Sequence, residues 1–146
     1  MTNERNGHPE VAVVQLANRL DELERLHVFF DEIGIRSGWP DRLKWDLVLS
    51  CEELVTNTIS YGYPDSEAGS RYIRVAVRAH ADSVEVCLED EALPFNPLET
   101  DEPDVGLGID EREVGGLGVF LVKRMVNEAT YERTETGNRI VLRKRL

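Results

Sequence analysis

The stretch SCEELVTNTISYG (residues 50–62) combines an apolar helical seam with two polar side chains one turn apart, Glu53 and Asn57. At about 100° per residue, these two fall on the same side of a helix as Asp46 and Ser50. The opposite side is a broad apolar arc formed by Leu47, Val48, Cys51, Leu54, Val55 and Ile59. Residues four apart are neighbours on a helix surface, so Glu53 and Asn57 point the same way. The ordinary interpretation of such a pair is a solvated helix face, and the spacing alone identifies no site.

The N-terminal segments alternate between loose, strand-like and helical patterns. Residues 1–9 are polar and are expected to form a flexible tail. Residues 10–17 (EVAVVQLA) have strand character. A helix is expected over residues 18–34, with Asn18 as its N-cap and Gly34 as its stop.

The helix that carries the opening stretch is expected to begin near Pro40, which suits a first-turn position, and to run to about Tyr61. After a turn-rich stretch, residues 71–80 and 82–90 alternate between apolar and polar. This alternation predicts an antiparallel hairpin. The positions expected to face a core are Ile73, Val75, Val77, Val84, Val86 and Leu88.

The C-terminal part begins with an irregular stretch, residues 91–115, that contains Pro, Gly and many acids. A long structureless connection inside a compact domain is often a functional lid. Residues 115–129 predict a glycine-led helix, and residues 130–135 and 138–146 predict a hairpin that turns near Gly137.

This order of elements predicts a layer of helices on one face of a mixed, mainly antiparallel sheet, a two-layer α/β sandwich. A chain of 146 residues suits one domain, which we expect over residues 10–146.

The composition restricts the classes of function. The net charge of −11 argues against nonspecific binding to nucleic acid or to an anionic membrane. The terminal RKRL is interpreted as a solvated strand end. No segment has the length and apolarity of a membrane span or a signal peptide, so we expect a cytoplasmic protein. Cys51 and Cys87 form no metal-type spacing and are expected to be reduced core thiols.

Two polar features of the sequence, the Glu53/Asn57 face and the stretch around Asp90, could bind a ligand. The Glu53/Asn57 face offers a carboxylate that could accept a proton and an amide oxygen suited to Mg²⁺. The stretch EDEALPFNP (residues 89–97) puts Asp90 where a strand gives way to a loop. A carboxylate there could accept a hydrogen bond from an exocyclic amine such as that of adenine. The alternative is a turn in which Asp90 is a local cap.

The third feature is GGLGVFLVK, residues 115–123. Glycines that lead into a helix allow close backbone approach and expose N–H groups at the positive end of the helix dipole, which favours an anion. The stretch is neither a Walker A loop nor a Rossmann fingerprint. A flexible hinge is an equal alternative.

Together, in this order and in a chain this short, the three features resemble the ATP-binding domain shared by gyrase, heat-shock chaperone ATPases, sensor histidine kinases and mismatch-repair ATPases (the GHKL superfamily). More specifically, they are similar to the single-domain anti-sigma factor serine/threonine kinases. EELVTNTISYG matches the N box of that family, DEALPFNP its adenine-side box, and GGLGVFLVKRMVNEATYER its second glycine box and following strand. The resemblance covers nearly the whole chain and implies the Bergerat-type ATP-binding fold.

The resemblance implies a role for each polar residue of the first two boxes. Glu53 would be the general base or would position the acceptor hydroxyl. Asn57 would hold Mg²⁺ against the phosphates of ATP. Asp90 would bond the adenine amino group.

The resemblance also assigns the glycine box to the phosphates. Gly116 and Gly118 would approach them, Gly115 would be a hinge of the lid, and Leu117 would lie in the same nucleotide-contacting turn. Ala92 would lie against the base. There the family usually has Gly, and an alanine adds a methyl group and restricts any positive φ.

Two further departures are Tyr61, where a His is often found, and the unusually acidic lid at residues 98–114. Acidic side chains are unfavourable beside a triphosphate unless they face water.

Three functions follow as hypotheses. The first is an ATP-dependent serine/threonine kinase that phosphorylates a small STAS-type anti-sigma factor antagonist and sequesters a sigma factor. The resemblance also suggests a homodimer, formed through the N-terminal strand and first helix. The second is a module that binds ATP and a partner without catalysis. The third, a catalytic fragment of a sensor histidine kinase, lacks a phosphoacceptor context around His8, His27 or His80. Topoisomerase and chaperone functions need a second domain, for which the chain is too short.

Overall fold

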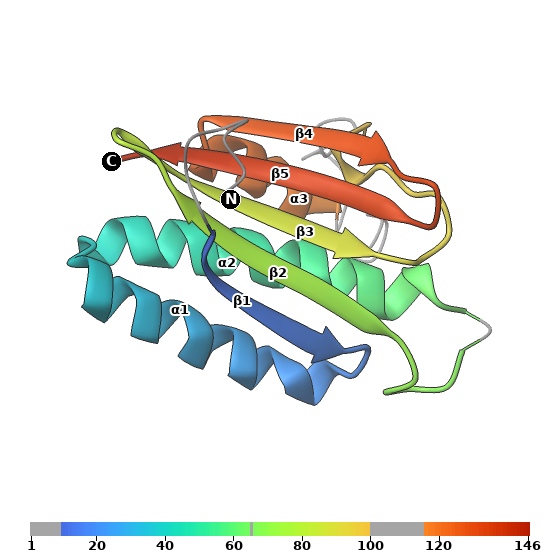
Figure 1. Ribbon diagram of the computed structural model, residues 1–146. Coiled ribbons are helices and arrows are strands. Elements are labelled where there is room, and N and C mark those ends of the chain that lie inside the picture. The colour runs from blue at the N-terminus through green and yellow to red at the C-terminus, as the bar shows by residue number, and fades with distance from the viewer. Residues whose placement is uncertain (1–9, 65, 100–115) are drawn as a thin grey trace.

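The computed structural model describes residues 10–64, 66–99 and 116–146. Within these ranges the chain forms a five-stranded sheet with helices packed against one face (Figure 1). All four described strand pairings are antiparallel. This confirms the predicted two-layer α/β sandwich.

The first half of the chain supplies the edge strand and two of the helices. Its elements are β1 (Glu10–Ala17), the 3₁₀ turn η1 (Leu20–Glu22), α1 (Leu23–Ser37), α2 (Asp41–Asn57) and the π-helical turn η2 (Thr58–Gly62). The second half supplies most of the sheet. Its elements are β2 (Tyr72–Ala79), β3 (Ser83–Asp90), the 3₁₀ turn η3 (Pro97–Glu99), α3 (Gly116–Met125), β4 (Glu128–Arg133) and β5 (Asn138–Arg145).

The strand order is β1-β2-β3-β5-β4, and the core lies between this sheet and the helices. Alternate strand positions point toward the helices because successive side chains of a strand face opposite sides. All six positions predicted to face the core are buried, which confirms that prediction: Ile73, Val75, Val77, Val84, Val86 and Leu88. The helices bury Leu26, Phe30, Leu47, Val55 and Val122 against them.

The opposite face of the sheet carries charged side chains that pair across neighbouring strands. Glu89 of β3 contacts Arg74 of β2 at 3.5 Å and Arg139 of β5 at 3.1 Å. Arg139 also contacts Glu132 of β4 at 2.6 Å. Opposite charges directly across strands stabilise a sheet modestly, by about 0.2–1 kcal/mol per pair.

The prediction for α1 was wrong at both ends. Asn18 does not cap the helix: its side chain accepts a hydrogen bond from Arg71 N at 2.9 Å and donates one to Glu67 O at 3.3 Å. The helix ends at Gly38, in the left-handed region at φ 67°, and not at Gly34. Gly34 lies inside the helix, and its carbonyl oxygen accepts the hydrogen bond from the backbone N–H of Gly38.

The second helix begins and ends close to the predicted limits, but its last turn differs. Residues Thr58–Gly62 form a π-helical turn after α2. Such turns are rare and are found frequently at functional sites.

The glycine-led helix is confirmed but ends at Met125, and Glu128 already belongs to β4. Pairing overrides the helical pattern here, because Glu128 and Ala129 lie opposite Arg143 and Leu142 of β5. The final hairpin is confirmed.

Both cysteines are free, as predicted. Cys51 is buried in the core, whereas Cys87 is only half-buried and lies outside the core cluster. Burial raises the pKa of the Cys87 thiol to about 11, so this thiol is protonated at neutral pH. The expected tail, residues 1–9, and most of the expected lid, residues 100–115, lie outside the described residues. None of the described helices is long and apolar enough to cross a membrane.

Candidate nucleotide-binding site

The polar side of α2 is covered and not solvated. Ser50 is fully buried, and its hydroxyl donates a hydrogen bond to Asp46 O at 2.7 Å. Asn57 is only 5% exposed, and its side chain hydrogen-bonds to Glu53. The ordinary interpretation of this face as a solvated helix surface is therefore wrong. The two residues singled out by spacing contact each other inside the molecule.

The element that lies over Glu53 is the N-terminal part of α3. A Cβ built on Gly118 would lie 1.6 Å from Glu53 Oε1 and 2.7 Å from its Cγ, so no side chain can stand at position 118 with Glu53 in this place. Gly116 and Leu117 form the start of the same helix, and Gly115 lies outside the described residues. The glycine box thus meets the predicted catalytic carboxylate directly. The first turn of a helix is also where free N–H groups favour an anion.

The environment of Glu53 favours its protonated form. Burial raises the pKa of the Glu53 carboxyl, the neighbouring charge of Glu52 raises it further, and the hydrogen bond from Asn57 opposes both effects. A carboxylate with a raised pKa is a better proton acceptor, and such shifts gather at functional sites.

Asp90 ends β3 and is held by backbone and side-chain donors. Its Oδ1 accepts hydrogen bonds from Ala92 N at 2.9 Å and from Asn138 Nδ2 at 3.0 Å. The Thr58 hydroxyl lies 3.5 Å from Oδ2 and also donates to Leu54 O at 3.2 Å. The bond to Ala92 N is the local cap considered as the alternative for Asp90, and it occupies one oxygen only.

Asp90, Asn57 and Ala92 line one cavity, together with Leu54, Thr58, Gly62, Leu93, Phe95, Pro97, Asn138 and Ile140. Three of the predicted site residues, from two segments of the chain, are therefore brought together. The cavity has a volume of only about 10 Å³, which is room for about one water molecule. A purine base can enter only if lining side chains move, and among the lining side chains Leu93 and Phe95 are exposed.

Ala92 fits without backbone strain. It is 4% exposed, and no described residue other than glycine has a positive φ. A Cβ built on Gly62 would lie 2.8 Å from the Ala92 methyl group, so the glycine of η2 provides the space that this alanine fills. The extra methyl group narrows the cavity without distorting the loop.

Asn138 and Thr58 were not predicted as site residues. Asn138 was predicted only as the first residue of the last strand, yet it is 5% exposed and bonds to Asp90, 48 residues away in the chain. Thr58 lies inside the matched N box, one residue after Asn57, and that position was the available signal for it.

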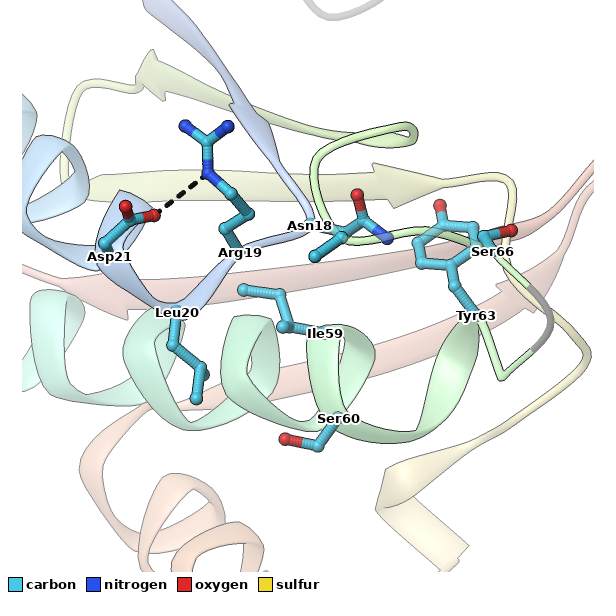
Figure 2. A pocket seen from close by; sticks show the side chains of 9 residues that line it. Asn18, Arg19, Leu20, Asp21, Ile59, Ser60, Tyr63 and Ser66 are labelled. Carbon is cyan, nitrogen blue, oxygen red and sulfur yellow. Dashed lines mark hydrogen bonds and ion pairs between the residues drawn. The ribbon is translucent and has the colours of Figure 1, made fainter.

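A larger hollow of about 410 Å³ is lined by Ile59, Ser60 and Tyr63 and by the segment from Asn18 to Asp21 (Figure 2). None of the predicted nucleotide contacts lines it. Its charged groups, Arg19 and Asp21, pair with each other at 3.1 Å. The small cavity at Asp90 therefore remains the candidate for the base, since it is the one that the predicted residues share.

Comparison with known proteins identifies the family. Residues 16–144 match the model of the histidine kinase-like ATPase domain, and the chain belongs to this family. The serine/threonine-protein kinase BtrW of Bordetella bronchiseptica is 22% identical over 114 residues, which cover 78% of this chain and 79% of that protein. The serine-protein kinase RsbW of Listeria innocua is 29% identical over 101 residues, which cover 66% of this chain and 62% of that protein.

Two further similarities agree with this assignment. The anti-sigma F factor of Clostridium novyi is 28% identical over 109 residues, covering 69% of this chain and 70% of that protein. Among solved structures, that of the RsbU and RsbW domains of Rv1364c from Mycobacterium tuberculosis superposes on 94% of this chain with a TM-score of 0.62 and 16% identity. This chain spans about a third, 32%, of that solved chain, and the likeness concerns the fold. The expected resemblance to anti-sigma factor kinases of the GHKL type is thus confirmed.

Proposed function

We propose that this chain is an ATP- and Mg²⁺-dependent serine/threonine kinase that phosphorylates a small STAS-type anti-sigma factor antagonist and binds a sigma factor. The observation that carries the proposal is the contact between Gly118 and Glu53, which leaves no room for a side chain at position 118. It joins a carboxylate of raised pKa to the start of a glycine-led helix, an arrangement suited to a base beside a phosphate.

The Asp90 cavity supports the adenine end of the proposal. Asp90 Oδ1 is occupied by two N–H donors, and Oδ2 keeps room to accept a hydrogen bond from the amino group of adenine. Asn57 lines this cavity and also contacts Glu53, so it connects the base end to the catalytic end.

Asn57 is the residue that would hold Mg²⁺. Its amide is buried and adjacent to a carboxylate, and an amide oxygen is a hard ligand of the kind that Mg²⁺ accepts alongside waters and substrate phosphates. Among the described residues, no group of three or more His, Cys, Asp or Glu side chains could hold a metal by itself. Bound Mg²⁺ would neutralise charge on the phosphate oxygens.

In the proposed reaction, the serine or threonine hydroxyl oxygen of the antagonist attacks the γ-phosphorus of ATP. The bond from that phosphorus to the bridging β–γ oxygen breaks, and ADP leaves with that oxygen. Glu53 accepts the hydroxyl proton, or orients the hydroxyl so that the proton leaves toward it. Phosphoryl transfer requires mainly positioning and charge neutralisation, which Glu53, Asn57 and α3 would supply.

The names of the relatives support the class of activity, since they include two serine or serine/threonine kinases and an anti-sigma factor. A cytoplasmic location and a homodimer formed through β1 and α1 are part of the same proposal. β1 is an edge strand of the described sheet, and such an edge can pair with another chain.

The narrow base cavity favours a second candidate function, a module that binds partners without catalysis. The Ala92 methyl group fills space next to Gly62, and the remaining volume of about 10 Å³ would have to expand for ATP.

Two measurements separate the candidates. The first is a calorimetric titration with ATP, with and without Mg²⁺, on the unaltered chain and on Asn57→Ala. We expect Mg²⁺-dependent binding that Asn57→Ala abolishes. The second is transfer of labelled γ-phosphate to a panel of purified STAS-type antagonists, with Glu53→Gln compared against Glu24→Gln, an exposed α1 carboxylate that serves as the matched control.

For a kinase, Glu53→Gln should slow transfer by about two to four orders of magnitude, the usual contribution of a general base, and Glu24→Gln should not. ATP binding without transfer to any antagonist would favour the non-catalytic module. Absence of ATP binding would contradict the kinase and would leave a scaffold that binds protein partners alone.

A further inference from the structure

Asn138 occupies an unusual position for a residue at a hairpin turn. It is the first residue of β5, and the preceding Gly137 lies against the backbone of Asp90: a Cβ on Gly137 would be 1.7 Å from Asp90 O. This close approach brings the beginning of β5 to the end of β3. The Asn138 side chain is thereby enclosed at the rim of the Asp90 cavity, which it lines.

The two ends of the Asn138 amide are both satisfied by the protein. Its Nδ2 donates to Asp90 Oδ1 at 3.0 Å and to Leu93 O at 2.9 Å. Its Oδ1 accepts from Phe95 N at 3.3 Å and from the Tyr131 hydroxyl at 2.5 Å. An amide has two donor hydrogens and an oxygen with two lone pairs, so this set uses its full capacity. The side chain therefore has one fixed orientation, with the oxygen toward β4 and the nitrogen toward Asp90.

This orientation determines which oxygen of Asp90 is available. Asp90 Oδ1 receives two N–H donors, one from Ala92 N and one from Asn138. Among the described residues, the hydrogen-bond partner of Oδ2 is the Thr58 hydroxyl at 3.5 Å, whose one hydrogen is shared with Leu54 O. Without Asn138, the carboxylate could rotate and share both oxygens between the loop and a ligand.

The same side chain fixes the wall of the cavity. Leu93 O and Phe95 N belong to the loop that follows β3, and both bond to Asn138. Leu93 and Phe95 line the cavity with Asp90. The amide thus sets the distance between the carboxylate and the loop that would enclose a base.

We propose that Asn138 is a positioning residue for base recognition, which holds Asp90 so that a single carboxylate oxygen accepts a hydrogen bond from the 6-amino group of a purine. This inference rests on the proposed nucleotide site. Its consequence is selectivity: ATP, which carries a 6-amino donor, is preferred over inosine 5′-triphosphate, which carries a 6-oxo acceptor that Asp90 repels.

The test is a titration of the full chain with ATP and with inosine 5′-triphosphate. The variants are Asn138→Ala, the milder Tyr131→Phe, which removes one hydrogen bond to Asn138, and the control Asn127→Ala. Asn127 is another asparagine of the C-terminal hairpin region, exposed, whose Oδ1 accepts from Arg145 N away from the cavity. Circular dichroism and thermal melting of each variant show that it is folded.

We expect Asn138→Ala to weaken ATP binding by about tenfold to a hundredfold, the effect of one to two lost buried hydrogen bonds, and to bring the two affinities close together. Tyr131→Phe should weaken ATP binding and reduce the preference for ATP over inosine 5′-triphosphate, each by a smaller factor. Asn127→Ala should change neither the affinity nor the preference. If Asn138→Ala does not fold, the result with Tyr131→Phe decides.

Unchanged affinity and unchanged preference in a folded Asn138→Ala, or in Tyr131→Phe where that variant decides, would overturn the inference and leave the nucleotide site intact. If the unaltered chain binds neither nucleotide, the proposed function itself is wrong, and the inference falls with it.

Discussion

Two effects disfavour the charged form of Glu53, its burial and the neighbouring negative charge of Glu52, and both raise its pKa. A base is active only when deprotonated, so phosphotransfer should decline as the pH falls through this raised pKa, above the ordinary Glu value of 4.5. We predict that Glu52→Gln lowers the Glu53 pKa and moves the acidic decline of the rate to lower pH. Desolvation, the larger cause, stays, so the shift is partial.

The measurement is the pH dependence of kcat for phosphotransfer. Glu32→Gln, an exposed carboxylate on α1, is the matched charge control and should leave the profile where it is. An acidic decline that is identical with and without Glu52 would mean that Glu53 is not the group that titrates.

The contact between Gly62 and Ala92 gives a second prediction for single residues. Gly62→Ala would place a methyl group 2.8 Å from the Ala92 methyl, and overpacking of this kind costs about 1–3 kcal/mol of stability. Adding Ala92→Gly removes the opposing methyl group, so the double variant should recover most of that loss. Urea denaturation gives the four free energies of the double-mutant cycle.

The control for this cycle is Ala68→Gly in the Gly62→Ala background. Ala68 is exposed, and its replacement should restore nothing. Strict additivity of Gly62→Ala and Ala92→Gly would show that the two side chains do not meet.

Among the elements, α3 is fixed at its end by Lys144 of β5. The Lys144 ammonium contacts Met125 O, at the C-terminus of α3, at 2.6 Å and Asp46 of α2 at 3.1 Å. A cation at a helix C-terminus is favourable, and this one also joins α3 to α2, the two helices of the candidate site. We predict that Lys144→Met costs about 1–3 kcal/mol of stability, because it leaves a half-buried carboxylate and a carbonyl without this donor.

Hydrogen exchange locates the effect: the amides of α3 should lose protection more than those of α1. The matched control is Arg42→Met, since Arg42 contacts the same Asp46 only at 3.9 Å from an exposed position. Its loss should stay within about 0.5 kcal/mol, as for other exposed ion pairs. Equal losses for both variants would show that the ammonium does not hold α3.

The elements also show what a sequence can and cannot predict. The β2–β3 hairpin was predicted in full because one of its faces is buried, so apolar residues recur at every second position of each strand. The end of α1 was not, because the helix continues through Gly34 and stops only at Gly38, the glycine that adopts a left-handed conformation. The π-helical turn η2 has no local pattern either.

The candidate site divides in the same way. Glu53 and Asn57 could be found because they lie on the same face of one helix. Gly118 could be found because a cluster of glycines at the start of a helix is conspicuous. That Gly118 lies on Glu53 follows only from the packing of α2 against α3. Asn138 lies opposite Asp90 on the adjacent strand β5, and a pairing between residues 48 positions apart leaves no local pattern in the sequence.

In the whole molecule, the sheet separates two kinds of surface. One face packs on the helices and carries the candidate site, and the other carries the paired charges of Arg74, Glu89, Arg139 and Glu132. These pairs are partly exposed, so they contribute little to stability and are weakened by salt. Stability should therefore depend on the core and on whatever binds at the helix side.

A ligand that binds only the folded state stabilises the whole domain. At a free concentration about 100 times its Kd, ATP should add about 2.7 kcal/mol to the free energy of unfolding. For a domain of this size, that corresponds to a rise in Tm of about 5–10 °C. We predict this rise for ATP with Mg²⁺, measured by calorimetric melting.

Asn57→Ala should abolish the part of the Tm rise that depends on Mg²⁺, whereas the hairpin control Asn127→Ala should keep the whole rise. Because the stabilisation depends on the logarithm of the ratio of free ATP to Kd, the rise should continue to grow slowly as the ATP concentration increases above Kd. A Tm that is the same with and without ATP would mean that the cavity stays closed and that the helix side of this sheet serves a protein partner alone.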